Sequence, residues 1–118
     1  MSALTQGGGA PRPPIQFENV NVVCKANVYF DGGVVSHTVL FKDGTKKTLG
    51  VIRPGTFKFN TDVAEQMDIL SGVCRVKLPK ETAWKAFTAG TSFQVPAKSL
   101  FEITLESGFC EYICSYLK

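Results

Sequence analysis

The stretch EQMDILSGVCRVKL, residues 65–78, alternates apolar and polar side chains on both sides of a Ser-Gly pair. Such alternation is the period of a half-buried β-strand, and Ser71-Gly72 is a turn signal. We therefore expect two short strands joined by a tight turn. Alternation along the first strand places Met67 and Ile69 on the same face as Glu65.

The same pattern recurs along the rest of the 118-residue chain, and no stretch carries a convincing helical stripe. Short strands with turn signals at intervals of roughly 8–12 residues are typical of an all-β sandwich or barrel. The length fits one domain, which we place at residues 17–118 after a disordered tail, residues 1–16, rich in Gly and Pro. The predicted strands are 34–41, 56–60, 67–70, 73–78, 91–95, 101–105 and 109–117.

The charge balance argues against a nucleic-acid partner. The net charge is only +3, and the densest basic cluster, residues 42–47, includes Asp43 and Gly44 and is typical of a solvated turn. A mildly positive pocket for a small anion remains compatible with this balance. No apolar run reaches the roughly 18 residues of a membrane span, so we expect no membrane partner.

The cysteines and the N-terminus predict a cytoplasmic protein. The N-terminus lacks the apolar core of a signal peptide. The four cysteines contain no CxxC pair, and we expect them to be buried, reduced thiols. They are Cys24, Cys74, Cys110 and Cys114.

Two motifs, EQMDILSG (65–72) and GTSFQVP (90–96), resemble the paired motifs of cupins, so we predict a jelly-roll, cupin-like β-barrel. Cupins that hold a metal supply histidines before the carboxylate and after the proline. Here FNTDVA (59–64) contains no histidine, and Phe101 stands five residues after the proline. Because transition-metal sites in this fold need imidazole or several carboxylates, Glu65 alone predicts no metal cofactor.

A more specific resemblance rests on several collinear pieces. They are NVYFDG (27–32), SHTVLFKDGTKKTLGV (36–51), the Glu-x-Met ahead of Ser-Gly, and AWKAFTAGTSFQVP (83–96). From residue 20 to residue 117 the chain resembles the pyrimidine/purine nucleoside phosphorylase family of small bacterial cupins. It departs from the family pattern at Gly33 and Lys98.

The resemblance implies an activity and partners. Phosphate cleaves the N-glycosidic bond of purine and pyrimidine nucleosides, giving free base and α-D-ribose 1-phosphate. It also implies a homodimer, with inorganic phosphate as co-substrate and no other cofactor. Two alternatives stay open at the level of sequence: a cupin that binds a small molecule without catalysis, and a structural or partner-binding barrel.

Phosphorolysis passes through a cationic sugar, as glycoside hydrolysis does, and this chemistry suggests roles for particular residues. We expect Glu65 to accept hydrogen bonds from the ribose hydroxyls and to stabilise the sugar cation. The alternative interpretation is that Glu65 is a surface residue that begins a hairpin. His37 is a donor to phosphate or base near neutral pH, or else a histidine satisfied by a backbone carbonyl. Arg53, Lys47 or Arg75 can bind phosphate.

The base needs an aromatic surface, and stacking tolerates any base. Phe101 is the strongest candidate for stacking on the base, because it occupies the position where metal-binding cupins have a histidine ligand. Gln94 can read base edges if its side chain faces inward. The aromatic candidates are Tyr29, Phe57, Phe93, Phe101 and Tyr116.

Overall fold

The computed structural model of the chain describes residue 14 and residues 16–117, and these residues form strands with one short 3-10 turn, η2 (Phe30–Gly32). The predicted tail, residues 1–16, lies outside the described residues except at positions 14 and 16. No helix in the described part of the chain is long and apolar enough to cross a membrane. The strands are β1 (Asn21–Val22), β2 (Asn27–Tyr29), β3 (Val34–Leu40), β4 (Lys46–Ile52), β5 (Gly55–Asn60), β6 (Ala64–Ser71), β7 (Val73–Lys77), β8 (Lys85–Thr88), β9 (Ser92–Val95), β10 (Leu100–Leu105) and β11 (Cys110–Leu117).

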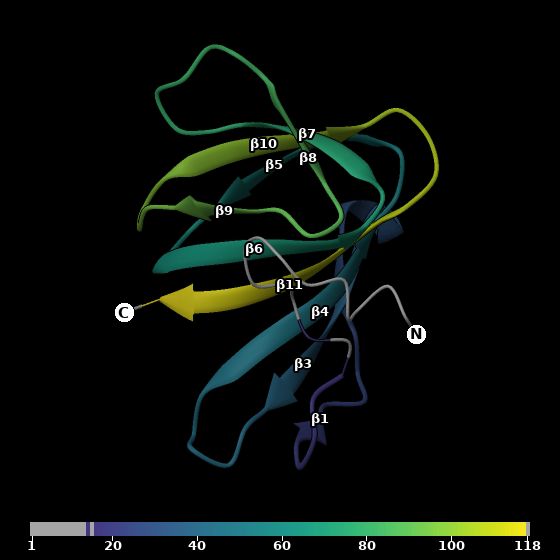
Figure 1. Cartoon of the computed structure of the whole chain (residues 1–118), viewed down its shortest axis with the longest axis vertical. Helices are drawn as coiled ribbons and strands as arrows, with labels where there is room; N and C mark the ends of the chain where they lie inside the picture. Colours follow the sequence, from purple (N-terminus) through teal and green to yellow (C-terminus); the bar gives the residue numbers. More distant parts are fainter. Residues whose placement is uncertain (1–13, 15, 118) are drawn as a thin grey trace.

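The strands form two antiparallel sheets that face each other (Figure 1). The larger sheet has the order β1-β3-β4-β11-β6-β9, with β2 also paired to β3, and the smaller has the order β5-β10-β7-β8. The smaller sheet lies over the β9, β6 and β11 part of the larger sheet, while β4, β3 and β1 extend beyond it (Figure 1).

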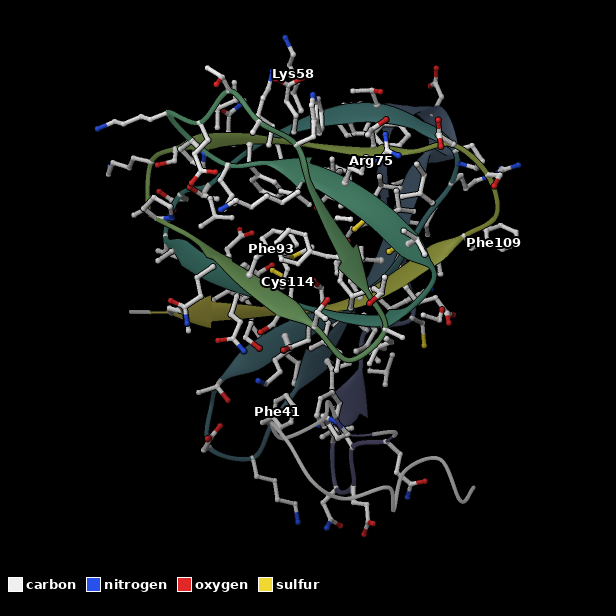
Figure 2. All side chains as sticks on the ribbon, turned by 45° about the horizontal axis from the view of Figure 1, so that its top comes forward. Phe41, Lys58, Arg75, Phe93, Phe109 and Cys114 are labelled. Carbon is white, nitrogen blue, oxygen red and sulfur yellow. The ribbon has the colours of Figure 1, made fainter. Side chains whose placement is uncertain are left out.

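Alternation along the strands builds the core between the two sheets. On β6, Met67 and Ile69 are buried, as predicted, and Phe93 and Val95 of β9 lie beside them. Figure 2 shows Phe93 between the layers. The other buried core members come from β3, β4, β5, β7, β10 and β11. The largest fully buried residues of the core include Ile52, Ile69, Ile103, Val34, Val76 and Val95.

The turn of the opening stretch is fixed by backbone geometry. Gly72 joins β6 to β7 with a positive φ of 87°, and a Cβ at this position would overlap the carbonyl oxygen of Phe109. Only glycine adopts this conformation at no steric cost. The predicted turn between the two strands is therefore confirmed.

Several sequence expectations need correction. Among the described residues, the two sheets are not hydrogen-bonded into a closed barrel, so that detail of the predicted fold is not confirmed. Strands β1, β2, β4 and β8 were not predicted. Three cysteines are buried as expected, but Cys24 is exposed, because it lies in the segment between β1 and β2 at the edge of the larger sheet.

Candidate functional site

A small cavity of about 80 Å³ opens between the sheets. One wall is formed by the larger sheet and is partly polar, whereas the facing wall is apolar and aromatic. The lining residues are Tyr29, Ser36, Thr48, Ile52, Phe59, Glu65, Met67, Phe101, Ile103, Tyr112, Cys114 and Tyr116.

The polar wall is centred on β11, from which Tyr112, Cys114 and Tyr116 face the cavity on alternate positions. Figure 2 shows Cys114 between the two layers. The register places Cys114 beside Thr48 of β4, and Tyr116 beside Glu65 of β6. These cross-strand neighbours are close enough for their side chains to interact.

A glycine shapes the end of this wall. Gly50 of β4 pairs with Tyr112, and a Cβ at position 50 would overlap the Tyr112 ring. The absence of a side chain therefore lets the ring lie against the β4 backbone. Ser36 hydrogen-bonds to Tyr112, which holds the phenol at this position.

In the part of the chain that the structure describes, Glu65 is the one carboxylate that lines the cavity. Burial raises the pKa of its carboxyl group, while a hydrogen bond from the Cys114 thiol lowers it by a smaller amount. Burial raises the pKa of Cys114 as well, so this residue is a thiol that donates to the carboxylate. Glu65 is thus held in a defined orientation in a partly water-excluded site, where a charge acts strongly on its neighbours.

The facing wall is aromatic. Phe59 and Phe101 stack with ring centroids 5.6 Å apart, and Tyr29 meets Phe59 edge to face at 6.3 Å. Phe93 supports Phe101 from the core at 6.0 Å. Tyr29 belongs to the larger sheet, so a planar ligand placed against Phe59 would meet the π surface that lies opposite the polar wall.

An open depression adjoins the cavity and shares Glu65 and Tyr116 with it. Its other lining residues come from the β3–β4 turn and the β5–β6 connection. Lys46 lies there, with its Nζ 5.5 Å from the centroid of the Tyr116 ring. The depression therefore brings a cation to the mouth of the cavity.

Four of the residues selected from the sequence come together in this cavity. Glu65, Tyr29, Phe101 and Tyr116 all line it, although they belong to β6, β2, β10 and β11. The strand alternation that placed Met67 on the face of Glu65 is also confirmed, because Met67 lines the same cavity.

Lys47, Arg75 and Phe93 are not among the described residues that line the cavity, and neither are four further selected residues. His37 is on the opposite face of β3 from Ser36, with its Nδ1 3.2 Å from the carbonyl oxygen of Val23, as in the alternative interpretation. Gln94 is exposed and donates to Gln66, because Phe93 and Val95 take the inward positions of β9.

The other two are Arg53 and Phe57. Arg53 is exposed just after the end of β4. Phe57 is buried in the core, where its ring packs against Phe30 with centroids 5.0 Å apart.

The sequence reading missed several polar lining residues: Ser36, Thr48, Tyr112 and Cys114. For Cys114 and Tyr112 the signal was present, since they share the alternating face of Tyr116 in 110–117. For Ser36 and Thr48 the signal is weak, because hydroxyl residues in strands are usually solvent-facing.

The donor set does not fit the metal that many cupins hold. The cavity neighbours of Glu65 are Cys114, Met67 and Tyr116, and among the described residues no three His, Cys, Asp or Glu side chains form a cluster suited to a metal ion. A thiol whose pKa is raised is a poor ligand, because metals bind the thiolate.

The profile of one protein family, described as pyrimidine/purine nucleoside phosphorylase, matches residues 24–116. The chain belongs to this family. A family member from Burkholderia ambifaria (strain MC40-6), named pyrimidine/purine nucleoside phosphorylase, is 58% identical over 86% of this chain and 95% of its own length.

Solved structures agree with the family's fold. A protein of unknown function from Acinetobacter sp. ADP1 is 50% identical, with a TM-score of 0.84 over 86% of this chain and 98% of its own. A cupin superfamily protein from Desulfitobacterium hafniense DCB-2 is 14% identical, with a TM-score of 0.58 over 72% of this chain and 78% of its own. The second likeness shows a cupin-type fold for this member of the phosphorylase family.

Proposed function

We propose that the protein is a pentosyltransferase that uses phosphate to cleave the N-glycosidic bond of purine and pyrimidine nucleosides. The products are free base and α-D-ribose 1-phosphate. The observation that carries the proposal is the position of Glu65, the one carboxylate of the cavity lining, on a polar wall that faces an aromatic wall. Membership of the phosphorylase family supports the same reaction.

Glu65 has the central role in the proposed chemistry. Its carboxylate accepts from the ribose hydroxyls and stabilises the positive charge that develops on the sugar as the glycosidic bond breaks. The Cys114 thiol orients it. A fixed negative charge in a partly desolvated site needs no reorganisation when the sugar cation forms, which is the condition for effective electrostatic catalysis.

The aromatic wall accounts for a broad choice of base. Tyr29, Phe59 and Phe101 offer stacking surfaces, and stacking does not depend on the pattern of base-edge donors and acceptors. Among the described residues that line the cavity, none has an amide side chain or a positive charge. A site without such groups has few means of rejecting one base class in favour of the other.

The remaining expectations belong to the same proposal. The enzyme works as a homodimer in the cytoplasm, with phosphate as co-substrate and no metal or organic cofactor. The competing hypothesis is a cupin of the same shape that binds a small molecule without reacting with it.

The test is the release of free base from inosine and from uridine in the presence and absence of phosphate. We expect release from both nucleosides, and only with phosphate present. Release that does not depend on phosphate would indicate a hydrolase instead. Binding of either nucleoside without any release would support the non-catalytic cupin.

A further inference from the structure

The inner face of β3 and β4 carries a group of polar side chains that have no part in the contacts proposed above for the sugar and the base. Thr38 pairs directly with Thr48, and Asn27 donates from Nδ2 to both Ser36 and Thr38, at 3.2 Å each. Ser36 and Thr38 therefore lie on one side of β3. We call Thr38, Thr48 and Lys46 the hydroxyl shelf.

The hydroxyls of the shelf can donate to a ligand. An oxygen that accepts from the Asn27 amide keeps its own hydroxyl hydrogen for another acceptor. Thr48 hydrogen-bonds to both Tyr116 and Cys114. Because sulfur is a weak acceptor, the Thr48 hydroxyl can turn from Cys114 and donate to an anion instead. Two donors on neighbouring strands are suited to an anion.

Lys46 supplies the charge. It is two positions before Thr48 along β4, so both side chains lie on the same face. Lys46 also lies at the depression that shares Glu65 and Tyr116 with the cavity. It is the one basic residue among the described residues that line the cavity or this depression.

The basic residues selected from the sequence do not reach this place. Lys47 is on the opposite face of β4, where its Nζ donates to Ser115 Oγ at 2.7 Å. Arg75 is exposed on β7 of the smaller sheet, far from Cys114 on the outer side of that layer (Figure 2). Arg53 is exposed beyond the other end of β4.

The spacing between Lys46 and Glu65 allows one residue to contact phosphate while the other contacts the ribose of the same complex. Ser115 pairs with Lys47, so the next residue, Tyr116, lies beside Lys46, and Tyr116 pairs with Glu65 on its other side. With strands about 4.8 Å apart, the backbones of β4 and β6 are roughly 10 Å apart. A ribose above Tyr116 can contact Glu65 with its hydroxyls and still present its C1′ toward β4.

We propose that the hydroxyl shelf binds the phosphate co-substrate, with Lys46 providing the charge and Thr38 and Thr48 providing hydrogen bonds. This inference rests on the proposed function. An oxygen of hydrogen phosphate forms the bond to C1′ while the bond from C1′ to the base nitrogen breaks, and the electron pair of that bond leaves with the base. The proton of hydrogen phosphate passes to the base, so the products are ribose 1-phosphate and a neutral base.

The test compares Lys46→Met and Thr48→Val with Lys47→Met, a matched control on the outer face of the same strand. Because hydrogen bonds to charged groups are among the stronger ones, we expect each shelf variant to raise the KM for phosphate by about tenfold or more. The KM for inosine should stay near that of the wild type, and Lys47→Met should resemble the wild type in both constants. Lys46 is exposed, so Lys46→Met tests the site even if Thr48→Val fails to fold.

Titration with inorganic phosphate alone, followed by calorimetry, separates this inference from the proposed function. Weaker phosphate binding in Lys46→Met than in Lys47→Met supports the shelf, whether or not the wild type cleaves nucleosides. If the wild type shows phosphate-dependent cleavage while folded Lys46→Met keeps a native KM and native affinity for phosphate, the shelf is not the phosphate site and the proposed function stands.

Discussion

Replacing Glu65 by glutamine removes the charge and keeps the shape, since the amide oxygen can still accept from the Cys114 thiol. Losing one electrostatic contact to a transition state typically raises the barrier by about 2.7–4 kcal/mol. Because each 1.36 kcal/mol is a factor of ten, the rate should fall roughly 10² to 10³-fold. The fall should be larger in kcat than in KM, because the sugar cation exists only in the transition state.

The pH dependence gives a second expectation for the same residue. Burial raises the pKa of Glu65, so the active carboxylate is lost on acidification at a higher pH than for an ordinary glutamate. Wild-type activity should decline as pH falls through this raised pKa, and Glu65→Gln should lack that limb of the profile.

Stability should change in the opposite sense to activity. The pKa of Glu65 is higher in the folded than in the unfolded state, so the protonated carboxyl group favours folding and its ionisation opposes folding. The stabilisation by the protonated form is complete below the unfolded-state pKa and is lost as the pH rises through the folded-state pKa. Above that pH, Glu65→Gln should therefore melt at the same temperature as the wild type or higher.

The assay measures inosine and uridine cleavage side by side, with Asp68→Asn as the control. Asp68 is also on β6, but it faces away from the cavity and accepts from Gln66. Both nucleosides should slow equally in Glu65→Gln, because the proposed contact is to the sugar. A folded Glu65→Gln protein with near-native rates would refute the role, and a defect confined to one base class would move the contact from the sugar to the base.

Three further predictions follow from the same geometry. Gly50→Ala should push the Tyr112 ring into the cavity and weaken nucleoside binding, measured as a higher KM in a protein whose circular dichroism is unchanged; an unaltered KM would show that the ring is not at the substrate. Treatment with a chelator should leave activity and melting temperature unchanged, since the donors around Glu65 do not suit a metal; a stoichiometric metal whose removal abolishes activity would contradict this. Light scattering at micromolar concentration should give twice the chain mass, because apolar side chains such as Val28 and Phe30 are exposed along the edge of the larger sheet; a monomer would count against the homodimer.

Local pattern was enough to predict the strands that have a regular apolar face. The opening stretch is an example, since Met67 and Ile69 are buried on one face of a strand that ends in a glycine turn. The same alternation brought Glu65 to the inner face. These features depend on residues close together in the chain, and the sequence contains them directly.

Strand β4 was missed for a physical reason connected with function. Its inward positions include Lys46, Thr48 and Gly50, which look like a solvated segment because the cavity, and not the apolar core, lies against them. Local pattern fails most where a site replaces core packing. The part of the polar wall that β4 contributes was therefore missed, next to the predicted turn at residues 42–47.

His37 shows a second limit of the sequence. Strand alternation places His37 and Ser36 on opposite faces of β3, but pattern alone does not show which face is inside. That choice depends on long-range pairing, because β3 joins β4 on one side and β2 on the other, and Asn27 of β2 bonds the Ser36 side. Residue type favoured histidine over serine as the functional group, and the fold placed the serine in the cavity.

The most direct test of the central claim is ³¹P NMR of the wild-type protein incubated with inorganic phosphate and either inosine or uridine. The account predicts that a ribose 1-phosphate resonance grows with both nucleosides at the expense of the phosphate signal, in step with release of free base. Two results would contradict the account. In one, base and free ribose are released while the phosphate signal stays constant; in the other, neither nucleoside is consumed.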